Sequence, residues 1–277
     1  AVLNAKWEEH GIKIKKVGVI YSKYENKLSF SDSKFVENDG ELELFDLEMG
    51  TRYYLMPYAV TEIGRFLANE TYIETKTPVA GNAVDLGLSV KWADMNIGAS
   101  DPDDYGDYFA WGETAPKASY NLSTYKYFDS FHPAYTKYVT KDTFGKIDNK
   151  SVLESSDDAA SALWGGNWRM PTDSEMKELA NTANCSWTYT ETSNGVAGYL
   201  VQSKKPGYTD RAIFLPAAGV CNEVGNPLSP GSIGQYWTSS LFTVTPSLAY
   251  KLNLFVDKVS PTSDARSWGC SIRPVTK

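Results

Sequence analysis

The chain has 277 residues, of which 42% are hydrophobic and 22% are charged, and its formal net charge at neutral pH is -7. It is long enough for two domains with separate cores, and its composition excludes extended disorder. The acidic balance argues against a nucleic-acid partner, and no apolar run approaches the roughly 20 residues that membrane insertion by this segment would require.

The first part of the chain contains short runs that are typical of β-strands. These runs cover residues 12–21, 41–45, 53–60 and 70–75, and residues 1–7 are also strand-like. Turn-forming residues separate them, and several short strands at this spacing predict a β-sandwich. We therefore expect residues 1–77 to form an N-terminal β-sandwich.

The sequence from Leu47 to Ala59 resembles the corner at which a late strand of fibronectin type III domains begins. The resemblance implies that Tyr53 packs inward while its hydroxyl group bonds to the backbone near Leu47. The unit is short for that family, so an edge strand is expected to be missing or to come from preceding sequence. That edge, near residues 1–21, would accept a strand from an assembly partner.

A change of composition marks the end of this unit. Proline and glycine in residues 76–82 end the last predicted strand, and sequence rich in tryptophan and glycine follows. We predict a linker over residues 78–83 and a second domain over residues 84–277.

The second domain begins with closely spaced aromatic and glycine residues. Gly98, Gly106 and Gly112 suit sharp bends between short strands. The same segment predicts that three large aromatic side chains are buried, namely Trp92, Phe109 and Trp111.

Two helices are predicted further along the second domain. Residues 156–163 combine acidic residues with an alanine-rich run, and Thr172 and Glu175 occupy the two key positions of a capping box. In such a box the threonine hydroxyl accepts a bond from the glutamate amide, and the glutamate side chain reaches back. Helices among short strands predict an α+β domain.

An acidic cluster lies at residues 101–107, where four carboxylates surround Gly106. Carboxylate oxygens are suitable ligands for calcium, but the spacing departs from the EF-hand loop, and the sugar-binding calcium motifs of animal lectins are absent. A solvated turn is the interpretation that the sequence favours.

No catalytic or metal-binding motif is evident. Cys185, Cys221 and Cys270 are odd in number and widely spaced, which leaves either one disulfide or, as we favour, buried free thiols. His10 and His132 lack catalytic neighbours. We therefore assign no catalytic residue, no cofactor and no metal ligand.

An ordered series of sequence blocks gives the second domain a family resemblance. The blocks cover residues 84–99, 104–113, 164–172, 213–219, 235–240 and 271–275. They resemble the major paralogous domain of bacterial surface proteins, a FISUMP-type branch of the C-type lectin-like fold. The resemblance implies an α+β C-type lectin-like domain at the cell surface or outside the cell, including lipid anchoring to the outer membrane through sequence absent here.

In diversified relatives the C-terminal end of the domain carries an exposed recognition surface. Here a hydrophobic framework that includes Tyr236 and Trp237 encloses two loops, around residues 241–247 and 257–268. Aromatic and arginine side chains would supply anchors, and serine, threonine and asparagine would supply hydrogen bonds. By resemblance the candidate ligand contacts are Phe242, Thr243, Lys251, Asn253, Asp257, Ser263, Asp264, Arg266 and Trp268.

Three classes of function remain open. The resemblance favours non-covalent recognition of a surface protein or a glycan through the C-terminal loops. A structural subunit of a pilus or surface assembly is the main alternative. An enzyme on a scaffold like that of sulfatase-modifying enzymes is the lesser one, because it rests on analogy alone. We therefore expect a binding protein rather than an enzyme.

Overall fold

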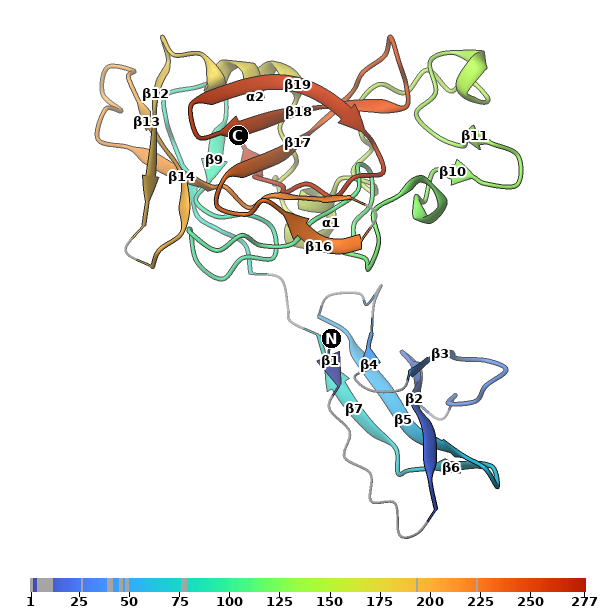
Figure 1. The fold of residues 1–277 in the computed structure, drawn as a ribbon. Coiled ribbons are helices and arrows are strands. Elements are labelled where there is room, and N and C mark those ends of the chain that lie inside the picture. Colours follow the sequence, from blue (N-terminus) through green and yellow to red (C-terminus); the bar gives the residue numbers. More distant parts are fainter. Residues whose placement is uncertain are drawn as a thin grey trace. The chain divides into compact units, whose positions relative to one another are not determined.

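The computed structural model divides the chain into two compact units, Ala1–Thr77 and Pro78–Lys277 (Figure 1). It is β-rich, with 39% of the residues in strands and 8% in helices, as the sequence predicts. The structure describes residues 2–3, 12–25, 27–38, 42–44, 47, 50–75, 79–192, 194–222 and 224–277.

The N-terminal unit is built on a sheet with the strand order β3-β2-β5-β6, in which β7 also pairs with β5. A second, two-stranded sheet pairs β1 with β4. Alternate side chains of β2 and β5, among them Val19 and Tyr53, share one buried cluster with Leu42 and Leu44. The two sheets therefore enclose a common core. The strands are β1 (Val2–Leu3), β2 (Ile14–Ser22), β3 (Lys34–Asn38), β4 (Leu42–Glu43), β5 (Arg52–Thr61), β6 (Arg65–Leu67) and β7 (Thr71–Glu74).

The predicted corner tyrosine lies inside this core. Tyr53 is 5% exposed, and Leu47 packs against the same cluster. The predicted bond from the Tyr53 hydroxyl to the backbone near Leu47 stays a prediction.

Strand β2 is an interior strand. It pairs with β3 on one side and with β5 on the other. The prediction of an open edge near residues 1–21 is therefore wrong for Ile14–Ser22, because hydrogen bonds occupy both sides of the strand. Residues 4–11 lie outside the described residues, and the described edges of this sheet are formed by β3 and by β6 with β7.

The C-terminal unit combines several small sheets with two short helices. The three-stranded sheets have the orders β20-β9-β8, β12-β13-β14 and β17-β18-β19, and two hairpins pair β10 with β11 and β15 with β16. Their bounds are β8 (Ala83–Val84), β9 (Lys91–Ala93), β10 (Phe128–Asp129), β11 (Ala134–Tyr135), β12 (Cys185–Glu191), β13 (Ala197–Ser203), β14 (Ala212–Pro216), β15 (Val220–Asn222), β16 (Val224–Leu228), β17 (Ile233–Leu241), β18 (Leu248–Phe255), β19 (Lys258–Ala265) and β20 (Val275–Thr276). The helices are α1 (Ala159–Trp164) and α2 (Asp173–Ala180), with 3-10 turns η1 (Leu122–Thr124) and η2 (Asp142–Phe144).

The last strand of this unit pairs with its second strand. Val275 of β20 pairs with Trp92 of β9, and both side chains are buried in the main core together with Tyr236 and Leu252. Helix α2 covers one face of the β17-β18-β19 sheet and adds Met176 to this core. The predicted linker already belongs to the unit, since the Asn82 amide bonds to Asp94 Oδ1 at 2.8 Å.

Local sequence patterns predict several of these features correctly. Phe109 and Trp111 are fully buried like Trp92. Gly98, Gly106 and Gly112 adopt positive φ angles of 81°, 71° and 82°, which non-glycine residues rarely adopt.

Both predicted helices are present. The capping box is confirmed, because Thr172 Oγ1 accepts a bond from the Glu175 amide at 3.3 Å and Glu175 Oε2 accepts one from the Thr172 amide at 2.8 Å. At the start of α1, the Asp158 carboxylate accepts a bond from the Ser161 amide at 2.9 Å.

Candidate functional site

The β17-β18-β19 sheet carries many of the predicted ligand contacts. Side chains alternate between the two faces of a strand. Leu252 and Leu254 of β18 point into the core, so Lys251 and Asn253 point to the opposite face. We call this second face the polar sheet face and define it by Gln235, Lys251, Asn253 and Asp264 together with the adjoining Trp268.

Lys251 is the centre of the polar sheet face. Its side chain is fully buried, and Nζ donates to Asp264 Oδ2 at 2.6 Å and to Gln235 Oε1. The ring centroids of Trp268 and Trp237 lie 5.5 and 6.0 Å from the ammonium group. A buried charge is costly unless it is paired, and here the carboxylate, the amide oxygen and two aromatic faces compensate it. Lys251 therefore joins the three strands, and its prediction as an exposed contact is wrong.

Arg266 is also a buried structural residue. Its guanidinium group donates to Tyr125 Oη at 2.9 Å and to the carbonyl oxygens of Lys137, Tyr138 and Pro246 at 2.9, 3.2 and 2.9 Å. The side chain has no exposed surface, so the prediction that it contacts a ligand is wrong. Its charge instead satisfies the carbonyl groups of loops that are distant in sequence.

Four of the predicted contacts lie away from Lys251, namely Phe242, Thr243, Asp257 and Ser263. Phe242 and Thr243 precede β18, whereas Asp257 follows it. Eight residues of β18 at about 3.3 Å each separate these ends by roughly 26 Å, so one small ligand does not reach both. Ser263 pairs with Tyr250 and therefore lies on the face that α2 covers.

The structure brings Asn253, Asp264 and Trp268 together around Lys251. Asn253 is half-buried, and its Oδ1 atom is buried without a hydrogen-bond partner. A buried acceptor without a donor is uncommon in proteins. The side chains of Asn253 and Asp264 as a whole are partly exposed, so this face presents polar groups to solvent. The partly exposed ring of Trp268 adds an apolar surface at the same face.

Sequence reasoning missed three residues of this region. In the sequence, Gln235 belongs to a block that predicts a structural role. In the structure it lies directly opposite Asn253 on the neighbouring strand. Ser260 and Thr262 of β19 lie opposite Asn253 and Lys251. Side chains alternate between the two faces of a strand, so the spacing of two between Lys251 and Asn253 predicts that they share a face. The same alternation in β17 and β19 could have identified the three missed residues.

A hollow of about 240 Å³ lies elsewhere in the C-terminal unit, beside the starts of α1 and α2. None of the predicted ligand contacts lines it. Burial raises the pKa of Asp158, and its carboxylate accepts bonds from the amides of Ser161 and Met170. Arg169 forms a two-point ion pair with Glu175. Asp158 and Arg169 therefore form hydrogen bonds and an ion pair that stabilise the N-terminal ends of the two helices.

The three cysteines are buried and unpaired in the structure. Burial raises the pKa of the Cys185 thiol to about 11 and the pKa values of Cys221 and Cys270 to about 12. A thiol nucleophile reacts as the thiolate, so these groups are poorly reactive near neutral pH.

The acidic segment at residues 101–107 forms a turn with separate hydrogen bonds. Asp104 Oδ2 accepts bonds from the Ser100 and Asp101 amides at 3.0 and 3.2 Å. Hydrogen bonds from Thr192 and Asn194 lower the pKa of Asp103. Across the described part of the chain, no three His, Cys, Asp or Glu residues are grouped as a metal site would require.

Comparison with protein-family models, with curated proteins and with solved structures finds no match for this chain. Among the described residues, no helix combines the length and the apolar character needed to cross a membrane. Function therefore has to be inferred from the site itself.

Proposed function

We propose that the chain is a cell-surface or secreted binding protein that recognises a protein or glycan ligand through the polar sheet face. The observation that carries this proposal is the partly exposed ring of Trp268 on the same face as the partly exposed polar side chains of Asn253 and Asp264. Polar side chains and an aromatic ring provide hydrogen bonding and apolar contact together.

The rigidity of the face supports recognition. The bonds from Lys251 to Asp264 and Gln235 fix strands β17, β18 and β19 relative to one another. Trp268 lies over the same ammonium group. Groups that are held in place before binding lose less conformational entropy when a ligand arrives.

The family resemblances support the proposed location and architecture. The C-terminal unit would be the C-type lectin-like domain of a FISUMP-type surface protein, and the N-terminal unit a fibronectin type III-like spacer. The alternative of a structural subunit is less well supported at this sheet. Its edge strand β19 contains Pro261, which lacks the N–H group that an added strand would use.

The test is binding by the purified chain to arrays of glycans and surface proteins. We expect Trp268→Ala and Asn253→Ala to weaken a saturable interaction by at least about tenfold, equivalent to roughly 1.4 kcal/mol. Asn253→Ala should leave the free energy of unfolding unchanged within about 0.5 kcal/mol, because its carbonyl oxygen has no internal partner.

Lys146→Ala, at an exposed position outside this sheet, is the matched control and should bind like the unaltered chain. Equal binding by all four proteins, or no saturable binding to either array, would refute the proposal.

A further inference from the structure

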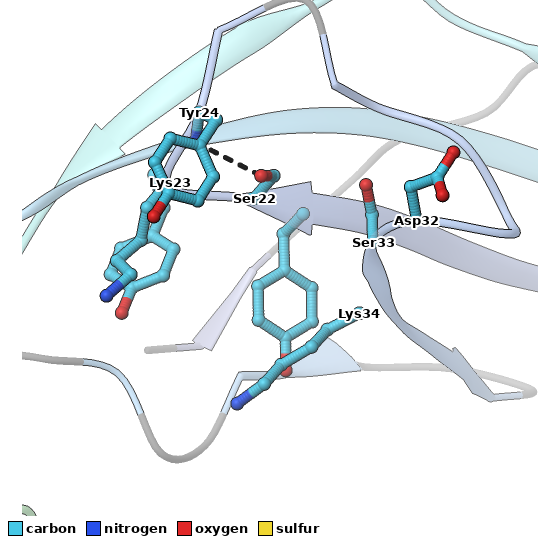
Figure 2. A pocket seen from close by; sticks show the side chains of 8 residues that line it. Ser22, Lys23, Tyr24, Asp32, Ser33 and Lys34 are labelled. Atoms are coloured by element: carbon cyan, nitrogen blue, oxygen red, sulfur yellow. Dashed lines mark hydrogen bonds between the residues drawn. The ribbon is translucent and has the colours of Figure 1, made fainter.

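Two adjoining hollows lie in the N-terminal unit beside the loop that joins β2 to β3. One has a volume of about 290 Å³ and is shown in Figure 2, and the other has a volume of about 490 Å³. They share Tyr24 and Asp32, and their other lining residues are residues 21–23, 27–29 and 33–34 and Tyr53. We call the two hollows together the loop groove.

The loop groove is a basic region of an acidic chain. Lys23, Lys27 and Lys34 line it, and Asp32 is the carboxylate that lines it. With the exposed Glu25 of the same loop, the described charged side chains from Lys23 to Lys34 sum to three minus two, a local charge of +1. Within the described residues, neither Lys27 nor Lys34 forms a salt bridge. The whole chain carries a charge of -7, so this local excess of positive charge marks a place for an anionic group.

The carboxylate that lines the groove, Asp32, accepts hydrogen bonds within the loop. The hydroxyl groups of Ser31 and Ser29 each donate to Asp32 Oδ2 at 2.9 Å and lower the pKa of that carboxyl group. Asp32 therefore stays ionised, and its Oδ2 atom is bonded to the two serine hydroxyl groups. The charge of Lys27 also favours the ionised carboxylate.

Aromatic rings and hydroxyl groups accompany the lysines. Figure 2 shows Lys23 and Tyr24 on one side of the hollow and Asp32, Ser33 and Lys34 on the other. Tyr24 is 62% exposed, and the Lys27 ammonium lies 5.3 Å from the centroid of its ring. An exposed tyrosine face suits the C–H face of a sugar ring, and serine hydroxyls suit sugar hydroxyls.

The loop is organised without a ligand. The Ser33 amide donates to the Ser29 carbonyl oxygen at 3.1 Å, and the Ser29 amide donates to Ser33 Oγ at 3.3 Å. Ser33 Oγ in turn donates to the Lys27 carbonyl oxygen. These bonds fix the backbone that carries the groove side chains, which reduces the entropy lost on binding.

We propose that the loop groove binds an acidic saccharide. Lys27 and Lys34 attract its carboxylate or sulfate groups, Tyr24 stacks on a sugar ring, and the serines bond to sugar hydroxyls. This site lies in the other unit from the polar sheet face, so it is independent of the function proposed above.

The experiment measures affinity by calorimetry for three oligosaccharides of equal length: a heparin-derived hexasaccharide, a hexagalacturonate and uncharged cellohexaose. We expect at least one acidic hexasaccharide to bind and cellohexaose to bind at least about tenfold more weakly. The two acidic probes distinguish sulfate from carboxylate as the recognised group.

The double variant Lys27→Gln/Lys34→Gln and the single variant Tyr24→Ala should each weaken binding by about tenfold or more. The double variant Lys13→Gln/Lys15→Gln makes the same charge change at exposed lysines of the same unit that do not line the groove, and should change affinity by less than about threefold. The proposal fails if neither acidic hexasaccharide binds, if cellohexaose binds equally well, or if both double variants weaken binding to the same extent.

Discussion

Two buried arginine side chains hold loops of the C-terminal unit in place by hydrogen bonds to backbone carbonyl groups. Arg273 donates to Asn96 Oδ1 at 2.9 Å and to the carbonyl oxygens of Ala93 and Phe214 at 3.1 and 2.8 Å. Burial lowers the pKa of its guanidinium group to about 10, so it remains charged at neutral pH. Arg266 has the same role, because irregular segments expose carbonyl groups that no strand partner satisfies.

Replacement of Arg266 by methionine should be strongly destabilising. Arg266→Met removes the charge-assisted bonds to three carbonyl oxygens and leaves these acceptors buried. We expect the free energy of unfolding to fall by about 3–5 kcal/mol in urea titrations followed by tryptophan fluorescence. Thr243→Ala, at an exposed position, should change it by less than about 0.5 kcal/mol. A loss below about 1 kcal/mol for Arg266→Met would contradict this role.

Asp157 should make the C-terminal unit sensitive to acid. Burial raises the pKa of its carboxyl group, but hydrogen bonds from Lys137 and Tyr138 and the charge of Lys126 outweigh burial and lower the pKa overall. A carboxyl group whose folded pKa is depressed stabilises the fold above its unfolded pKa of about 3.9, and this contribution is lost as the pH falls further.

Thermal unfolding between about pH 5 and pH 2 would measure this contribution. Asp157→Asn should be less stable than the unaltered chain at pH 5, and the difference should shrink towards pH 2. Asp257→Asn, at an exposed turn, serves as the control. A constant difference across the range would show that Asp157 does not act through its charge.

At the scale of the element, helix α2 illustrates what local sequence determines. Thr172→Ala removes the hydroxyl that accepts the Glu175 amide and should lower the free energy of unfolding by about 1 kcal/mol. Thr172→Ser keeps the acceptor and should retain most of that energy. Chemical denaturation of the two variants measures the effect, and equal losses would show that the hydroxyl does not contribute.

Features that depend on residues close together in the sequence could be predicted from the sequence. The pairing partners of strands, and the residues that neutralise buried charges, could not. The capping box and the glycine bends depend on residues within a few positions of each other. Whether β2 is an edge or an interior strand depends on its pairing with β3 and β5, and no pattern within residues 14–22 encodes that pairing. Likewise, Lys251 is the type of residue that is usually exposed, and its burial depends on Asp264 and Gln235.

At the scale of the whole molecule, each unit has its own core. The N-terminal cluster includes Val19 and Tyr53, and the C-terminal cluster includes Trp92 and Leu252. Separate cores predict two unfolding transitions in calorimetry, each of which responds to substitutions in one unit only.

Two glycine substitutions test this separation. A Cβ atom at Gly18 would lie 2.2 Å from the ring of Tyr58, which is fully buried and is packed against Phe30. A Cβ atom at Gly145, where φ is +148°, would lie 2.2 Å from the Tyr135 carbonyl oxygen. Overpacking of this kind costs about 1–3 kcal/mol.

Gly18→Ala should therefore lower the N-terminal transition by roughly 5–10 °C and leave the other transition in place. Gly145→Ala should lower only the C-terminal transition, by roughly 3–6 °C because that unit is larger. Each variant is the control for the other in the same calorimetric scan. If either substitution displaced both transitions together, the two units would unfold as one cooperative body, and the proposed independence of the loop groove from the polar sheet face would need to be tested in each unit expressed alone.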